Sequence, residues 1–94
     1  MIKGKGDNMK RFFPETMEFY GFKEFFQRRE YIKEQFRELE DYQQYVYRGY
    51  IYEMPFVTDY IRNTIWDYLN GFCPDIELVY TYSDYMRHKN KKDT

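Results

Sequence analysis

The chain has 94 residues and a formal net charge of −1, which suffices for one compact domain but not for two. Its 15 Lys and Arg balance 16 Asp and Glu, which excludes the uniformly basic profile of a DNA-coating protein. Apolar runs are only a few residues long, so the sequence predicts neither a membrane span nor a signal peptide. One cysteine, Cys73, cannot form an internal disulfide, and we expect a reducing, cytoplasmic location.

The hydrophobic residues are mainly aromatic. Twelve Tyr, nine Phe and one Trp stand against six Ile, three Leu and three Val, so we expect an aromatic core. Alanine is absent, and amino acids with A/T-rich codons are abundant. This composition indicates an A/T-rich genome, which favours a gene carried by a bacteriophage or another mobile element, with the chromosome of a low-GC bacterium as the alternative.

A long amphipathic helix is predicted over residues 22–48, ended by Gly49, because a left-handed helix cap costs glycine little. Its predicted core face follows the spacing of one helical side: Phe25, Ile32, Phe36, Leu39 and Val46.

A second helix is predicted over residues 55–70, closed by Asn70 and Gly71. Six residues share its apolar face: Val57, Tyr60, Ile61, Thr64, Ile65 and Tyr68.

The last segment permits two interpretations. Pro74 and Asp75 resemble a helix start, and Arg87, His88 and Lys89 resemble a helix end, which favours a third helix. The alternation of Ile76, Leu78, Tyr80 and Tyr82 instead favours a strand. We therefore predict an all-α, small three-helix bundle with an aromatic core and disordered basic termini. The alternative is an α+β fold with strands near 45–53 and 76–82.

The charge distribution suggests the domain limits. Residues 1–13 sum to +3, residues 14–84 to −7 and residues 85–94 to +3. We expect a flexible basic tail at 1–12, a single helical domain at 13–86 and a second flexible basic tail at 87–94. The segment Lys3-Gly4-Lys5-Gly6 resembles a translated ribosome-binding site, so Met9 is a candidate translation start.

Catalytic chemistry has few candidate residues here. The single histidine, His88, lies among basic residues with nothing local to orient it. We expect Cys73 to be buried filler, and one Cys with one His cannot complete a tetrahedral zinc site. No phosphate-binding glycine loop is present. We predict a protein that is not an enzyme and has no cofactor or metal.

Two surface features suggest binding. Helical projection places three tyrosines beside three carboxylates, away from the core face of the first helix: Tyr31, Tyr42 and Tyr45 with Glu34, Glu38 and Asp41. Lys33 and Arg37 flank the stripe of Glu30, Glu34, Glu38 and Asp41 and could pair with these carboxylates, leaving an ordinary solvated face. Trp66 projects onto the polar side of the second helix. It is either an exposed anchor for a partner or a core residue packed under residues 45–52.

These features predict a non-catalytic protein that binds and inhibits a host protein, of the anti-defence or host-takeover type, through its acidic aromatic surface. The expected partner has a basic or nucleic-acid-binding surface. One alternative is a nucleic-acid or nucleotide-binding module that uses tyrosine stacking and the basic residues Arg87, Lys89, Lys91 and Lys92. Another is a homo-oligomeric structural protein.

Overall fold

Helices are the regular elements in the part of the chain that the structure describes. The computed structural model describes the backbone of residues 17–93 and the side chains of residues 17–89. The predicted tail at 1–12 and the candidate start at Met9 lie outside the described residues. Within residues 17–93 there is no strand, so the predicted all-α class is confirmed, but five helices replace the predicted three: α2 (Phe22–Gln27), α3 (Arg29–Glu38), α4 (Asp41–Tyr52), α5 (Asp59–Leu69) and α6 (Asp75–Asp93).

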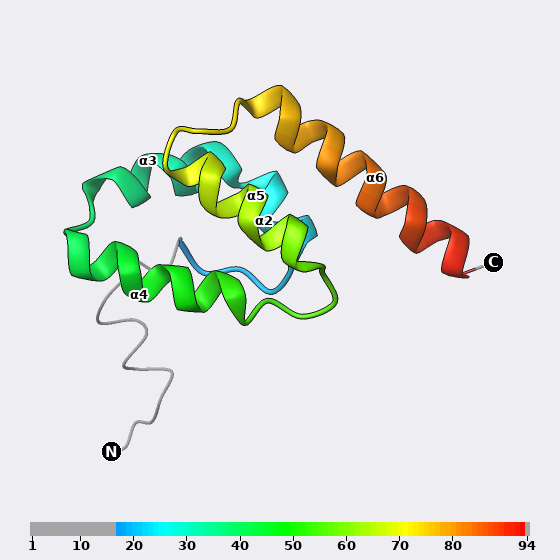
Figure 1. Cartoon of the computed structure of the whole chain (residues 1–94), viewed down its shortest axis with the longest axis horizontal. Helices are drawn as coiled ribbons and strands as arrows, with labels where there is room; N and C mark the ends of the chain where they lie inside the picture. Colours follow the sequence, from blue (N-terminus) through cyan, green and yellow to red (C-terminus); the bar gives the residue numbers. More distant parts are fainter. Residues whose placement is uncertain (1–16, 94) are drawn as a thin grey trace, which may run out of the picture.

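The helices surround α5. It contacts α3, α4 and α6, while α2 contacts α3 and α6. Figure 1 shows α3 and α4 on one side of α5 and the long α6 on the other. Because α5 has neighbours on both sides, side chains from more than one of its faces are buried.

The single helix predicted over residues 22–48 is wrong, because the chain bends twice within it. The first bend is at Arg28, which leaves helical geometry with φ −112° and ψ 16°. Its guanidinium donates a hydrogen bond to the backbone carbonyl of Glu18 at 2.6 Å and lies 3.7 Å from the Glu24 carboxylate. The bend allows Phe25 in α2 and Ile32 in α3 to enter the same core.

The second bend is at Leu39 and Glu40, whose extended backbones separate α3 from α4. The Glu40 backbone N–H donates to Oε1 of Gln43 at 2.9 Å as part of a capping box. Acidic side chains are stabilised at a helix N-terminus, which favours starting a new helix here. The bend changes the helical phase, so Tyr47 is buried and Val46, predicted in the core, is exposed.

The predicted helix end at Gly49 is also wrong, because α4 continues to Tyr52. A glycine inside a helix costs about 1 kcal/mol relative to alanine. Tyr47 and Ile51 on either side of it are fully buried, and their burial outweighs that cost.

α5 begins four residues later than predicted, because Thr58 caps it. The Thr58 hydroxyl accepts a hydrogen bond from the backbone N–H of Ile61 at 3.3 Å. The predicted core face is confirmed at Ile61, Thr64, Ile65 and Tyr68, whereas Tyr60 is exposed and Val57 lies before the helix.

α6 resolves the ambiguous last segment as a helix, and the alternative strands near 45–53 and 76–82 are wrong because both segments are helical. Asp75 forms an ion pair with Arg29 across 2.6 Å. The ring of Tyr82 stacks on Phe26 with centroids 4.1 Å apart. The helix continues to Asp93, past residue 86, where we expected the helical domain to end.

The core is aromatic, as predicted. The hydroxyl of the fully buried Tyr47 donates a hydrogen bond to the backbone carbonyl of Met17 at 2.6 Å, which connects α4 to the segment before α2. Burial raises the pKa of this hydroxyl well above its usual range. The buried rings belong to Phe19, Phe22, Phe25, Phe36, Tyr47 and Tyr68.

Candidate functional site

The three tyrosines predicted to be exposed on the first helix are exposed. The exposed fractions are 45% for Tyr31, 56% for Tyr42 and 71% for Tyr45. Tyr31 lies on α3, and the other two lie on α4. The carboxylates predicted beside them are exposed too. We call these six residues the acidic tyrosine surface: Tyr31, Glu34, Glu38, Asp41, Tyr42 and Tyr45.

Two helices build this surface from their outward sides. On α3, Tyr31, Glu34 and Glu38 are exposed while Ile32 and Phe36 are buried. On α4, Asp41, Tyr42 and Tyr45 are exposed while Tyr47 and Ile51 are buried. The turn at residues 39–40 joins α3 to α4, and the amide of Gln44 donates to the Phe36 carbonyl at 3.0 Å, which ties the start of α4 to the end of α3.

Two cations, Lys33 and Arg37, lie on the same helix as Glu34 and Glu38. Within residues 17–89, Glu34, Glu38 and Asp41 form no salt bridge. Lys33 instead places its ammonium 4.7 Å from the centre of the Tyr68 ring. An open hollow of about 610 Å³ on α3 is lined by Glu34, Gln35, Arg37 and Glu38. The surface therefore presents carboxylates that are available to a cationic group from outside.

Trp66 belongs to the packed interior more than to the surface. It is partly buried against the core, with its ring edge-to-face to Phe36 at a centroid distance of 5.4 Å. The guanidinium of Arg48 lies 5.8 Å from its ring centre. The structure supports the alternative in which Trp66 packs beside the 45–52 segment, because α3 and α4 flank α5 on two of its faces. The exposed rings of the acidic tyrosine surface are therefore tyrosines, and Trp66 is not among them.

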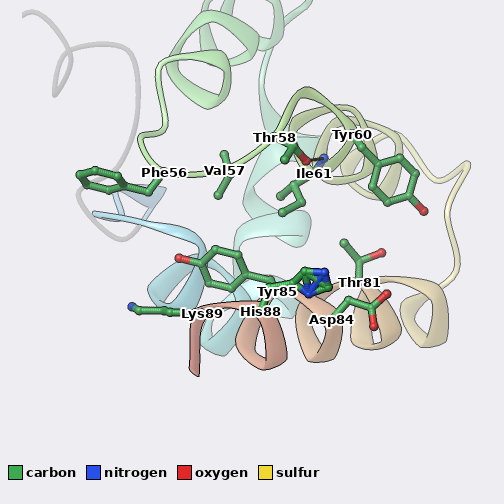
Figure 2. A pocket seen from close by; sticks show the side chains of 10 residues that line it. All are labelled: Phe56, Val57, Thr58, Tyr60, Ile61, Thr81, Asp84, Tyr85, His88 and Lys89. Carbon is green, nitrogen blue, oxygen red and sulfur yellow. Dashed lines mark hydrogen bonds between the residues drawn. The ribbon is translucent and has the colours of Figure 1, made fainter. Parts of the chain in front are cut away.

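A second concave region, which sequence reasoning missed, lies between the start of α5 and the second half of α6. Its volume is about 660 Å³. Val57, Ile61 and Tyr85 line its middle, as Figure 2 shows. We call it the α5–α6 groove; its other lining residues are Phe56, Thr58, Tyr60, Thr81, Asp84, His88 and Lys89. It depends on how α5 and α6 pack against each other, which no local pattern predicts.

Phe56 stands at one end of the α5–α6 groove with its side chain 92% exposed. Its backbone has φ +65°, in the left-handed region that non-glycine residues rarely adopt. Thr58 and Asp59 form a helix-start signature, and recognising it would have placed Phe56 in a loop.

The basic residues of the nucleic-acid alternative are only partly described. Arg87 forms an exposed ion pair with Asp84 at 3.0 Å. Lys89 lines the α5–α6 groove. The side chains of Lys91 and Lys92 lie outside the described residues. The structure therefore does not bring Arg87 and Lys89 into the acidic tyrosine surface.

The residues considered for catalysis are separate from one another in the fold. Cys73 is buried, as predicted, and burial raises the pKa of its thiol, which disfavours the reactive thiolate. His88 is exposed on α6 at the α5–α6 groove. Among the described residues no group of three or more His, Cys, Asp or Glu side chains could hold a metal ion.

Comparison with known proteins gives no relative. Searches against protein-family models, curated proteins and solved structures find no match to this chain. In the described part of the chain, no helix combines the length and the apolar character required to cross a bilayer.

Proposed function

We propose that this protein is a non-catalytic binding protein whose acidic tyrosine surface engages a cationic surface of another protein. The observation that carries the proposal is that Glu34, Glu38 and Asp41 lie beside exposed tyrosines and form no salt bridge within residues 17–89. Of the two cations beside them on α3, Lys33 lies on Tyr68, and Arg37, at i+3 from Glu34, forms no salt bridge with it within residues 17–89.

The tyrosines and the carboxylates of this surface would contribute to binding in different ways. Tyrosine rings supply large, rigid contact area and a hydroxyl, so Tyr42 and Tyr45 would be the anchors. The carboxylates would steer a Lys- or Arg-rich partner toward the surface and fix its register. Binding would then cover the cationic surface of the partner and exclude its anionic ligand.

The inhibitor version of this function is the most specific part of the proposal. A cationic surface that normally binds nucleic acid would be occupied by a protein that presents carboxylates in place of phosphates. The A/T-rich composition supports a phage or mobile-element origin, and a cytoplasmic site of action belongs to the same proposal. Direct nucleic-acid binding is less favoured, because carboxylates surround the exposed tyrosines and would repel phosphates.

The test is a capture experiment with a matched control. Wild type and the triple variant E34K/E38K/D41K are immobilised and exposed to bacterial lysate, and the bound proteins are quantified by mass spectrometry. The control E53K/D67K/E77K changes the net charge equally at exposed carboxylates elsewhere and also includes one first-turn acid. Circular dichroism verifies that all three chains are folded.

The proposal predicts at least one protein that wild type and the control capture equally and that the triple variant loses. That protein should bind more weakly as salt increases. If the triple variant captures the same proteins as wild type, or if both triple variants lose them equally, the acidic tyrosine surface is not the binding site.

A further inference from the structure

The α5–α6 groove has unlike ends. Figure 2 shows Phe56 and Lys89 at one end and Tyr60 and Asp84 at the other. The two charged residues are five positions apart on α6, which is about 7.5 Å along a helix axis. Each end therefore carries one aromatic ring and one charge, and the charges have opposite sign.

The two rings beside the groove are costly to leave in water. Phe56 is 92% exposed and Tyr60 is 64% exposed, next to the apolar residues Val57 and Ile61. An exposed apolar region of this kind marks an interaction site more often than a bare surface. The left-handed backbone of Phe56 holds its ring outward at a conformational cost, and such strain concentrates at functional positions.

The arrangement of the two ends matches itself under a two-fold rotation. An axis through the middle of the groove would place the Phe56 and Lys89 end of one copy over the Tyr60 and Asp84 end of another. An aromatic ring would then face an aromatic ring, and an ammonium would face a carboxylate, at two equivalent places. A two-fold interface requires this kind of self-complementarity, in which each contact occurs twice.

We infer that the α5–α6 groove is the interface of a symmetric homodimer of this chain, with Lys89 of each copy against Asp84 of the other. Within one copy Asp84 already pairs with Arg87 at 3.0 Å, but both side chains are about two-thirds exposed. Exposed pairs of this kind contribute little, so the carboxylate can accept a second cation without losing much. The inference is independent of the proposed function, which rests on the carboxylates and tyrosines of α3 and α4.

The first experiment measures the mass of the full chain in solution by light scattering and sedimentation from micromolar to millimolar concentration. Wild type should form dimers. Each of the single variants K89E and D84K places like charges at both symmetric contacts, so each should weaken the dimer by about tenfold or more. F56S should weaken it as well, with an unchanged circular dichroism spectrum, because the ring makes little contact within its own copy.

Mixing the two charge variants gives the sharper test. In a heterodimer of K89E with D84K, opposite charges face each other at both contacts, so the mixture should form dimers when neither variant does alone. This rescue cannot arise from a folding defect. The triple variant E34K/E38K/D41K should dimerise like wild type, which separates this interface from the acidic tyrosine surface.

Three results would overturn the inference. One is a monomer at every concentration, in which case the groove receives another molecule or none. Another is a dimer unchanged by F56S, K89E and D84K, which would place the interface elsewhere. The third is the absence of rescue in the mixture, or a loss of the dimer in E34K/E38K/D41K, which would indicate a head-to-tail contact between unlike surfaces.

Discussion

The ammonium group of Lys33 lies 4.7 Å from the centre of the Tyr68 ring, across the contact between α3 and α5. At i−3 and i+4 spacing on a helix, the charged neighbours of Lys33 are Glu30 and Arg37. By packing on a core tyrosine, Lys33 contributes to the fold and forms no ion pair with Glu30 within residues 17–89. Lys33 is thus committed to the contact between α3 and α5.

The buried hydroxyl of Tyr47 should contribute measurably to stability. Y47F removes the hydrogen bond to Met17 and leaves a buried backbone carbonyl without its partner. The expected loss is about 1–3 kcal/mol in the free energy of unfolding. Urea denaturation followed by circular dichroism measures it. A variant as stable as wild type would show that water or another donor satisfies the carbonyl.

The ion pair between Arg29 and Asp75 should make stability depend on acid pH. Its guanidinium holds the pKa of the Asp75 carboxyl below its usual range. A carboxyl with a lowered folded-state pKa stabilises the fold above its unfolded-state pKa, and this contribution disappears as the pH falls through the folded-state pKa. Because the Asp75 side chain is 46% exposed, D75N should cost only about 1 kcal/mol or less at neutral pH.

Urea denaturation of wild type and D75N across the acid range measures this dependence. The difference in unfolding free energy between the two chains should shrink on acidification and vanish once Asp75 is protonated in the folded state. A difference that stays constant at all pH values would assign the effect of the substitution to something other than the carboxylate charge.

Trp66 should behave as a structural residue. W66A removes an edge-to-face contact with Phe36 and exposes the surrounding core, so we expect a loss of about 2 kcal/mol for this partly buried ring. Thermal and urea unfolding measure the loss, and capture from lysate is compared under conditions in which the variant stays folded. Normal stability combined with lost capture would restore Trp66 as a binding anchor and contradict its packed role.

The left-handed backbone at Phe56 predicts an inverted order of substitutions. At ordinary helical or extended positions alanine is more stable than glycine, but with φ +65° glycine avoids the clash of a Cβ atom. We therefore expect F56G to be more stable than F56A by about 1 kcal/mol. The comparison is made in the K89E background, so that self-association does not contribute. A more stable F56A would mean that the loop relaxes to a negative φ.

Local patterns predicted the features that depend on one helix at a time. The spacing of Ile61, Thr64, Ile65 and Tyr68 identified the buried face of α5, and Tyr31, Tyr42 and Tyr45 are exposed as projected, although they lie on two helices and not on one. The aromatic composition predicted an aromatic core. Each of these follows from side-chain character and the 100° step between helical residues.

The failures have two different origins. The bend at Glu40 carries only a partial signal, because Glu40 and Gln43 have capping-box spacing but the usual pattern begins with Ser or Thr, and the apolar periodicity runs through this position. The bend at Arg28 has no comparable signal, since it depends on a hydrogen bond to Glu18 that only the folded chain provides. The position of Trp66 and the α5–α6 groove likewise follow from which helices flank α5.

The affinity of a captured partner for wild type, E34K/E38K/D41K and E53K/D67K/E77K, measured by titration calorimetry at low and high salt, tests the account most directly. We predict that the first triple variant binds about a hundredfold more weakly than wild type, as the reversal of central interface charges implies. The second should match wild type, and salt should weaken binding of wild type more than of the first variant. Equal affinity for wild type and E34K/E38K/D41K would contradict the account.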